Sequence, residues 1–241
     1  MNNEGLDRIL KEIQDNYFTD VLALICQLLA ISTILISSKK NKFSFLFLFY
    51  CISAFLLFFT LKLRFFFYGK NESSTLLVEG ENVIFAYIEY IVFYYFFTEI
   101  FRVQAIKLFL QLFFVGMTGA IIIFFYEAFF DQISDSTVLE FSDFIISPEL
   151  LLLGALCLTY YLKLLIKKPE LNLRQSPSFW IITGLFFYSL AITPFFMIIT
   201  TDFIIDHAKI YHILFALHHI SFSFLFIAII KAFLCKKPLT T

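Results

Sequence analysis

The sequence predicts an all-α integral membrane protein that folds as a bundle of seven transmembrane helices. Of its 241 residues, 60% are apolar and only 15% are charged, and the mean hydropathy is +0.86. A typical soluble domain is about 45–50% apolar and about 25% charged. The composition therefore excludes a soluble domain, a disordered chain, a disulfide scaffold and a nucleic-acid-binding protein.

The apolar runs have the length of membrane helices. A helix needs about 20 residues to cross the hydrocarbon core of a bilayer, whereas a barrel strand shows about 10 residues of alternating polarity. The runs here are continuous and about twice as long as such strands. We expect spans at residues 18–38, 43–61, 82–101, 106–127, 149–166, 178–200 and 210–234.

The ends of the chain are predicted to be short and polar. In residues 5–16, Leu6, Ile9, Leu10 and Ile13 repeat at helical spacing between charged side chains, a pattern typical of an amphipathic helix on the membrane surface. A frayed polar tail is the alternative. The predicted organisation is an extracytoplasmic amphipathic segment at 1–17, a membrane domain at 18–234 and a cytoplasmic tail at 235–241.

Two Ser-Pro pairs are typical of helix starts. Ser147, Pro148 and Glu149 resemble an N-cap, a proline at the first helical position and an acid in the first turn. They predict that the fifth span opens at 149, after a polar and acidic loop at 131–147. Ser176 and Pro177 repeat this signature before the sixth span.

Basic residues predict the orientation in the membrane. Seven spans place the two ends of the chain on opposite sides, and cytoplasmic loops carry the excess of Lys and Arg. Six basic residues fall on the side of the N-terminus, namely Arg8, Lys11, Lys62, Arg64, Lys70 and Lys209. The other twelve fall on the side of the C-terminus, namely Lys39, Lys40, Lys42, Arg102, Lys107, Lys163, Lys167, Lys168, Arg174, Lys231, Lys236 and Lys237. We therefore expect the N-terminus outside and the C-terminus in the cytoplasm.

The host compartment is inferred from composition. The bias toward Phe, Lys and Ile suits an AT-rich bacterial genome, so we expect a multi-pass protein of the bacterial inner membrane. Cys26, Cys51 and Cys157 lie within spans, and Cys235 lies at the inner boundary. Because none falls in an outer loop, no disulfide framework is predicted.

Glu89 is the clearest ionisable residue inside a predicted span. It lies about eight residues into the third span, at a depth of about 10–12 Å. An intramembrane acid is costly, faces the bundle interior and finds a partner there. Glu89 is therefore a candidate for binding a proton or a ligand, and the alternative is a hydrogen-bonded clamp between helices.

The seventh span contains three histidines, His212, His218 and His219. The last two are predicted to lie about 12–14 Å deep, close to the depth of Glu89. A Glu–His pair across the bundle would respond to pH near neutrality. Histidines that only hydrogen-bond between helices are the alternative.

Other polar residues within the spans are candidates to complete this proton- or ligand-binding pocket. Tyr188, in the sixth span, is one of the predicted binding residues together with Glu89 and the three histidines. The further candidates are Gln27, Gln111, Thr183, Ser221 and Ser223. Each of them alone is more often an ordinary interhelical hydrogen-bonding group.

Familiar catalytic motifs do not occur in the sequence. It contains no H-E-x-x-H, no G-x-S-x-G and no G-x-x-x-x-G-K-[ST] motif. A retinal site would need a lysine in the middle of the last span, but Lys209 and Lys231 lie at its ends. We therefore predict that the protein is not an enzyme and has no cofactor and no metal site.

Two segments carry a resemblance to a family. The sixth span begins with residues 176–184, followed by Tyr188, Pro194 and Phe195, and the third span contains Glu89 next to Tyr90. With these features the chain resembles an uncharacterised family of small bacterial seven-transmembrane-helix proteins. The resemblance implies a seven-helix bundle without soluble domains, which works beside a separate cytoplasmic signalling protein.

Three kinds of function remain open from the sequence, besides a membrane enzyme or cofactor carrier, which the missing motifs disfavour most. The first is a sensory or signal-transducing bundle with a proton- or ligand-responsive polar pocket. To transmit a signal, a ligand must bind two conformations of the bundle with different affinities. The second is a proton- or cation-coupled transporter or channel. The third is a structural membrane subunit. The lipid bilayer is the only partner that the composition itself predicts, and the oligomeric state is left open.

Overall fold

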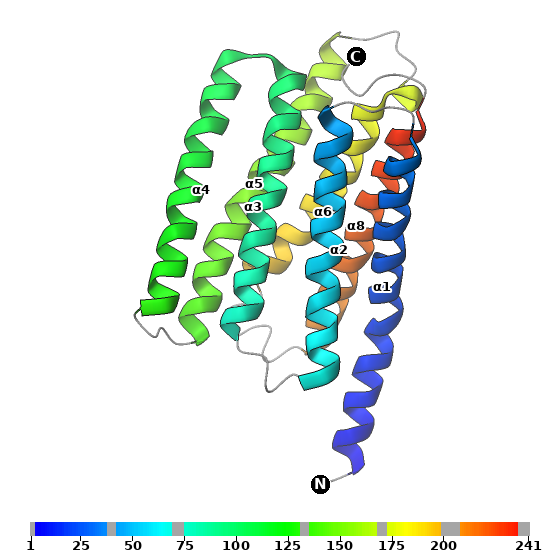
Figure 1. The fold of residues 1–241 in the computed structure, drawn as a ribbon, viewed down its shortest axis with the longest axis vertical. Coiled ribbons are helices and arrows are strands. Elements are labelled where there is room, and N and C mark those ends of the chain that lie inside the picture. The colour runs from blue at the N-terminus through cyan, green and yellow to red at the C-terminus, as the bar shows by residue number, and fades with distance from the viewer. Residues whose placement is uncertain are drawn as a thin grey trace.

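The prediction of a seven-helix bundle is confirmed by a computed structural model (Figure 1). The structure describes residues 3–37, 42–68, 75–130, 135–167, 173–198 and 208–235, although not every side chain within these ranges. Seven helices in this part are long and apolar enough to cross a membrane. They are α1 (Asn3–Ile36), α2 (Lys42–Tyr68), α3 (Thr75–Phe101), α4 (Gln104–Phe130), α5 (Asp135–Lys167), α6 (Pro177–Ile198) and α8 (Ala208–Leu234).

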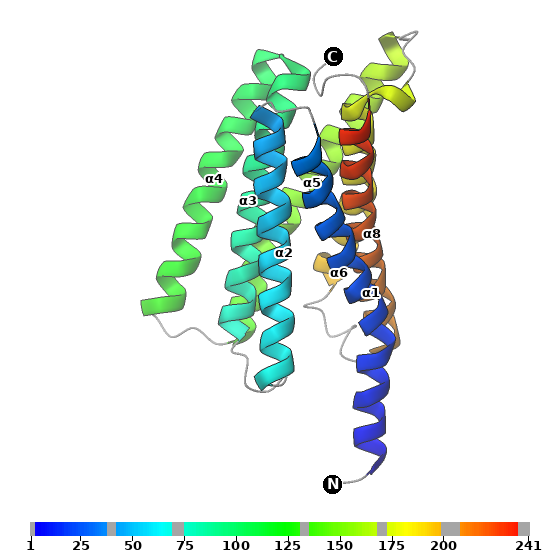
Figure 2. The same cartoon turned by 45° about the vertical axis from the view of Figure 1, so that its right-hand side comes forward.

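Six of these helices pack in a closed ring. Around the ring, α1 packs on α2, α2 on α3, α3 on α5, α5 on α6, α6 on α8, and α8 on α1. The remaining helix, α4, packs on α3 and α5 from outside, and both views place it at the edge of the bundle (Figures 1 and 2). Its span also has the smallest buried share of the seven.

Aromatic side chains fill the interior of the ring. The rings of Phe47 and Phe96 lie edge to face with 5.5 Å between their centroids. Tyr50 stacks on Phe226 with centroids 5.9 Å apart. Such pairs contribute about 0.5–1.5 kcal/mol each beyond the apolar area that they bury. They also fix the orientation of the tyrosine rings, which positions the Tyr50 hydroxyl.

The α6–α8 contact depends on a glycine. A Cβ atom at Gly184 of α6 would lie 2.6 Å from the Cβ of Ala228 and 3.1 Å from the Cα of Leu225 in α8. Small residues at helix interfaces allow backbones to approach closely, which is a main source of helix association in lipid. Gly184 therefore sets the separation of these two helices.

The predicted start of the fifth span is wrong. Helix α5 begins at Asp135 and continues through Pro148, so the expected loop at 131–147 is helical from that residue onward. Apolar residues before the proline, such as Val138 and Ile145, are buried and extend the helix. A proline within a membrane helix removes one backbone donor, and neighbouring helices compensate for its loss.

The amphipathic segment at residues 5–16 joins the first span without a break. It forms the first part of α1, which runs from Asn3 to Ile36. This part of α1 projects beyond the other helices at one end of the bundle (Figure 1). The side chains of residues 3–18 and the tail at 236–241 lie outside the described part of the chain.

Helices α3 and α4 are joined by a very short turn. Helix α3 ends at Phe101 and α4 begins at Gln104. Arg102, between them, has a φ of 51°, the left-handed conformation that commonly ends a helix. This turn lies at the same end of the bundle as the start of α6 and the end of α8 (Figure 1).

Candidate functional site

Glu89 joins three helices inside the ring. The Tyr50 hydroxyl of α2 donates a hydrogen bond of 2.6 Å to Glu89 Oε1, and the Tyr188 hydroxyl of α6 donates one of 3.2 Å to Oε2. Glu89 is 1% exposed, Tyr50 is wholly buried and Tyr188 is 4% exposed. Both oxygens of the carboxyl group are thus satisfied by phenol donors in an apolar interior, where an unsatisfied carboxylate would be very costly.

The aromatic core holds both donors in place. Tyr50 stacks on Phe85 with centroids 5.8 Å apart as well as on Phe226. The ring of Tyr188 packs at 5.5 Å from Phe222 of α8. Because neither tyrosine ring is free to turn away, the two hydroxyls remain directed at Glu89.

Glu149 is a second intramembrane acid, which the sequence analysis placed at a helix start. It is wholly buried in α5, and neither of its carboxyl oxygens has a hydrogen-bond partner among the described residues. It interacts electrostatically with Glu89 and with Tyr188. We call Tyr50, Glu89, Glu149 and Tyr188 the carboxylate cluster, which draws on α2, α3, α5 and α6.

His219 does not pair with Glu89 as the shared depth had suggested. Its Nδ1 atom lies 2.7 Å from Oδ1 of Asp20 in α1, and the other oxygen of Asp20 lies 2.6 Å from Nζ of Lys62 in α2. His219 is 3% exposed. Asp20, Lys62 and His219 form what we call the ion-pair cluster, and it connects α1, α2 and α8.

His218 lies among aromatic rings. The centroids of Phe195 and Phe222 are 5.7 Å and 6.2 Å from that of the imidazole, and His219 is 5.2 Å away. The buried Nδ1 atom of His218 has no hydrogen-bond partner in the described part of the chain. His212 is on α8, but its side chain lies outside the described residues.

The predicted pocket is thus divided into two clusters. Of its five residues, the structure brings Glu89 and Tyr188 into contact. His219 belongs to the ion-pair cluster, and His218 lies beside it. Phe222 packs against both Tyr188 and His218, so an aromatic ring stands between the carboxylate cluster and His218.

Of the other five polar candidates, three have local partners, one is buried without a partner among the described residues, and one lies outside the ring. The Thr183 hydroxyl is 2.8 Å from that of Tyr161 in α5. Ser221 and Ser223 donate to backbone carbonyls of their own helix. Gln27 is wholly buried without a partner among the described residues. Gln111 is exposed on α4 and lies outside the six-helix ring.

Sequence reasoning missed four residues of the two clusters, and three of them carried a signal. Asp20 lies at the start of the first span and Lys62 near the end of the second, so antiparallel helices bring them to the same level. Glu149 follows apolar residues that already have helical spacing, which argues against a helix start. Tyr50 is one of twelve tyrosines, and nothing in the sequence distinguishes it.

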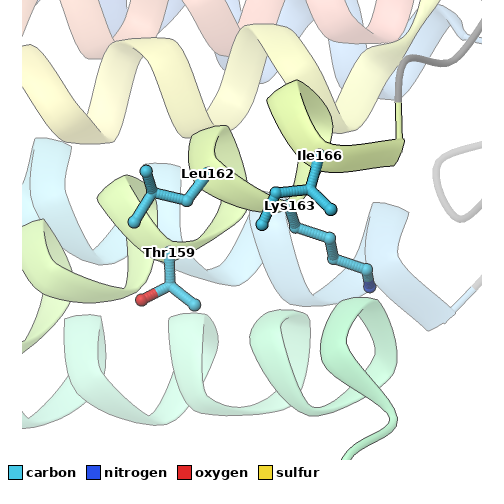
Figure 3. Close-up of a pocket in the computed structure, with 4 residues that line it drawn as sticks. All are labelled: Thr159, Leu162, Lys163 and Ile166. Atoms are coloured by element: carbon cyan, nitrogen blue, oxygen red, sulfur yellow. The ribbon is translucent and has the colours of Figure 1, made fainter.

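A separate groove lies on the face of α5 that points away from the interior of the bundle. It has a volume of about 340 Å³ and is lined by Thr159, Leu162, Lys163 and Ile166 (Figure 3). Leu162 and Ile166 are exposed, and Lys163 donates a 3.2 Å hydrogen bond to the carbonyl of Ile100. None of the lining residues belongs to either cluster, so we assign this groove to the lipid-facing surface.

Metal ligands do not gather in the part of the chain that the structure describes. It contains no group of three or more His, Cys, Asp or Glu residues that could hold a metal ion. Comparison of the chain with models of known families, with curated proteins and with solved structures gives no match. The site is therefore interpreted from its own geometry.

Proposed function

We propose that this polytopic membrane protein is a sensory or signal-transducing bundle whose carboxylate cluster responds to a proton or a ligand. The observation that carries the proposal is the position of Glu89, which binds Tyr50 of α2 and Tyr188 of α6 at once. A change in the charge or contacts of this one carboxyl group alters the links among three helices. Such a group has the connections that a switch needs.

The proposed orientation places the N-terminus outside and the C-terminus in the cytoplasm of a bacterial inner membrane. It rests on the twelve basic residues that the sequence predicts on the side of the C-terminus, against six on the side of the N-terminus. Arg102, Lys107 and Arg174 would then face the cytoplasm, where a separate signalling protein would bind and report the helix movement. The protein would not itself be an enzyme.

A distance measurement tests the response. Spin labels at Arg102→Cys and Arg174→Cys report the separation of the α3–α4 turn from the start of α6, and the four native cysteines are buried. We expect mild acidification to change this distance in the labelled chain. The change should be lost with Glu89→Gln and kept with the control Glu140→Gln, whose side chain is exposed on α5.

Two outcomes would contradict the proposal. One is a distance that stays constant across the pH range in the labelled chain. The other is an equal change in the Glu89→Gln variant. Proton flux in proteoliposomes that disappears with Glu89→Gln would instead favour transport. If Glu89→Gln and Tyr188→Phe both assemble normally and both keep the same distance response as the unsubstituted labelled chain, the polar groups serve packing, which would favour a structural subunit.

A further inference from the structure

We propose that Glu149 retains one exchangeable proton beside an ionised Glu89, so that the two acids form a single proton-binding site. This inference rests on the proposed function and deepens it, because it names the proton as the ligand of the carboxylate cluster. It concerns a residue that the sequence alone assigned to a helix start.

The hydrogen bonds divide the roles of the two acids. Glu89 accepts from two phenol donors, at 2.6 Å and 3.2 Å, and such donors stabilise a negative charge. Glu149 accepts from no donor in the described part of the chain, although it is wholly buried. A buried carboxylate without donors or a counter-charge is very costly, whereas a neutral carboxyl group is far less so.

The nearness of the two acids strengthens this division. Glu149 interacts electrostatically with Glu89, and helices α3 and α5 pack directly on one another. Two like charges in a medium of low dielectric constant repel strongly, so such a pair keeps one proton. Because Glu89 has the donors, the proton belongs on Glu149.

The surrounding ionisable groups supply no positive charge to replace that proton. On α3 and α6 the groups that interact electrostatically with Glu149 are an acid and two phenols, namely Glu89, Tyr90 and Tyr188. On α4 the ionisable residues stand near the helix ends, at Lys107, Tyr126 and Glu127. On α5 itself the nearest acid is Asp143, six residues before Glu149.

A metal cation fits this site less well than a proton. Sodium or a divalent ion needs several oxygen ligands, and the described residues contain no cluster of three or more acidic, histidine or cysteine ligands. Protonation needs no further ligand, since the carboxylate of Glu149 takes up one proton and becomes a neutral acid. The class of ligand is therefore a proton.

Infrared spectroscopy of the full chain in lipid tests the proposal. At neutral pH we expect a C=O stretching band from a protonated carboxyl group that shifts in D₂O and again when glutamate is carboxyl-labelled with ¹³C. The band should be lost in Glu149→Gln and kept in the matched control Glu140→Gln. In Glu89→Gln it should remain with an altered frequency, because the neighbouring charge is gone.

Several results would overturn the proposal. One is the absence of an acid band that shifts with glutamate labelling in the native chain, and another is an unchanged band in Glu149→Gln. A third is a change in the carboxylate bands when sodium replaces choline, seen only when Glu149 is present, because that would make a cation the ligand. If Glu149→Gln does not fold, Glu149→Asp serves instead. The acid band of Glu149→Asp should then no longer shift with glutamate labelling, and a band that keeps both its frequency and that isotope shift contradicts the assignment. A proton on Glu149 without any pH-dependent helix movement would contradict the proposed function and leave this inference standing.

Discussion

The Tyr50 hydroxyl donates a 2.6 Å hydrogen bond to Oε1 of Glu89 and thereby joins α2 to α3 in the centre of the bundle. Both residues are almost completely buried. Water cannot substitute for the phenol there, so the bond is expected to matter both for stability and for the position of the carboxyl group.

Removing the phenol donor should destabilise the bundle. Tyr50→Phe leaves Oε1 of Glu89 without that donor, and we expect a loss of about 1–3 kcal/mol in the free energy of unfolding. Unfolding in mixed detergent micelles measures it. Tyr95→Phe is the matched control, because Tyr95 is 55% exposed on α3. Equal stabilities of the two variants would show that the hydrogen bond contributes nothing.

Loss of Asp20 should weaken the contact among α1, α2 and α8. Asp20→Asn removes the negative charge that lies between Lys62 and His219. We expect a destabilisation of about 1–3 kcal/mol, below the 3–5 kcal/mol typical of fully buried pairs, because the Lys62 side chain is 27% exposed. Thermal unfolding in lipid nanodiscs checks this. Glu140→Gln, an exposed acid on α5, should change stability little, and a similar change in both variants would contradict the expectation.

A methyl group at Gly184 should force α6 and α8 apart. Gly184→Ala places a Cβ atom 2.6 Å from that of Ala228, and overpacking of this kind costs about 1–3 kcal/mol. Gly119→Ala is the control, since a Cβ there meets nothing within 4 Å. Detergent-induced unfolding of both variants provides the comparison.

A second substitution makes the Gly184 test specific. Ala228→Gly in the Gly184→Ala background removes the nearest clash and should restore part of the lost stability. The rescue is expected to be incomplete, because Leu225 also lies within 3.2 Å of the added atom. Full stability of Gly184→Ala alone would mean that the helices separate without cost.

The orientation can be measured with a membrane-impermeant maleimide. We expect Glu140→Cys to be labelled from the outside of intact cells and Arg174→Cys only after the membrane is opened, because α5 carries the chain from one side to the other. Both positions are exposed, and the wild-type chain with its buried cysteines gives the background. The reverse labelling pattern would invert the proposed topology.

Much of the site could not be predicted, and particular residues show why. Glu89 was identified because a charge within a long apolar run has few explanations. Glu149 was misassigned because a Ser-Pro pair is a common helix start, and local sequence does not reveal whether a helix continues through it. His219 was matched to Glu89 by depth, yet depth says nothing about the side of the helix on which a partner lies.

The sequence by itself determined the class of fold, since only helices and closed β-barrels satisfy their backbone hydrogen bonds in lipid, and the apolar runs are too long and continuous for barrel strands. It also determined that Glu89 must face the interior. The tertiary structure decided that six helices close into a ring with α4 outside, that Glu89 meets Tyr50 and Tyr188, and that His219 meets Asp20. Apolar residues cover all sides of the membrane-spanning parts of these helices, so no amphipathic face there indicates which side is buried. The neighbours of each helix are set by shape and by polar groups that must find partners, and both become visible only when the helices are packed together.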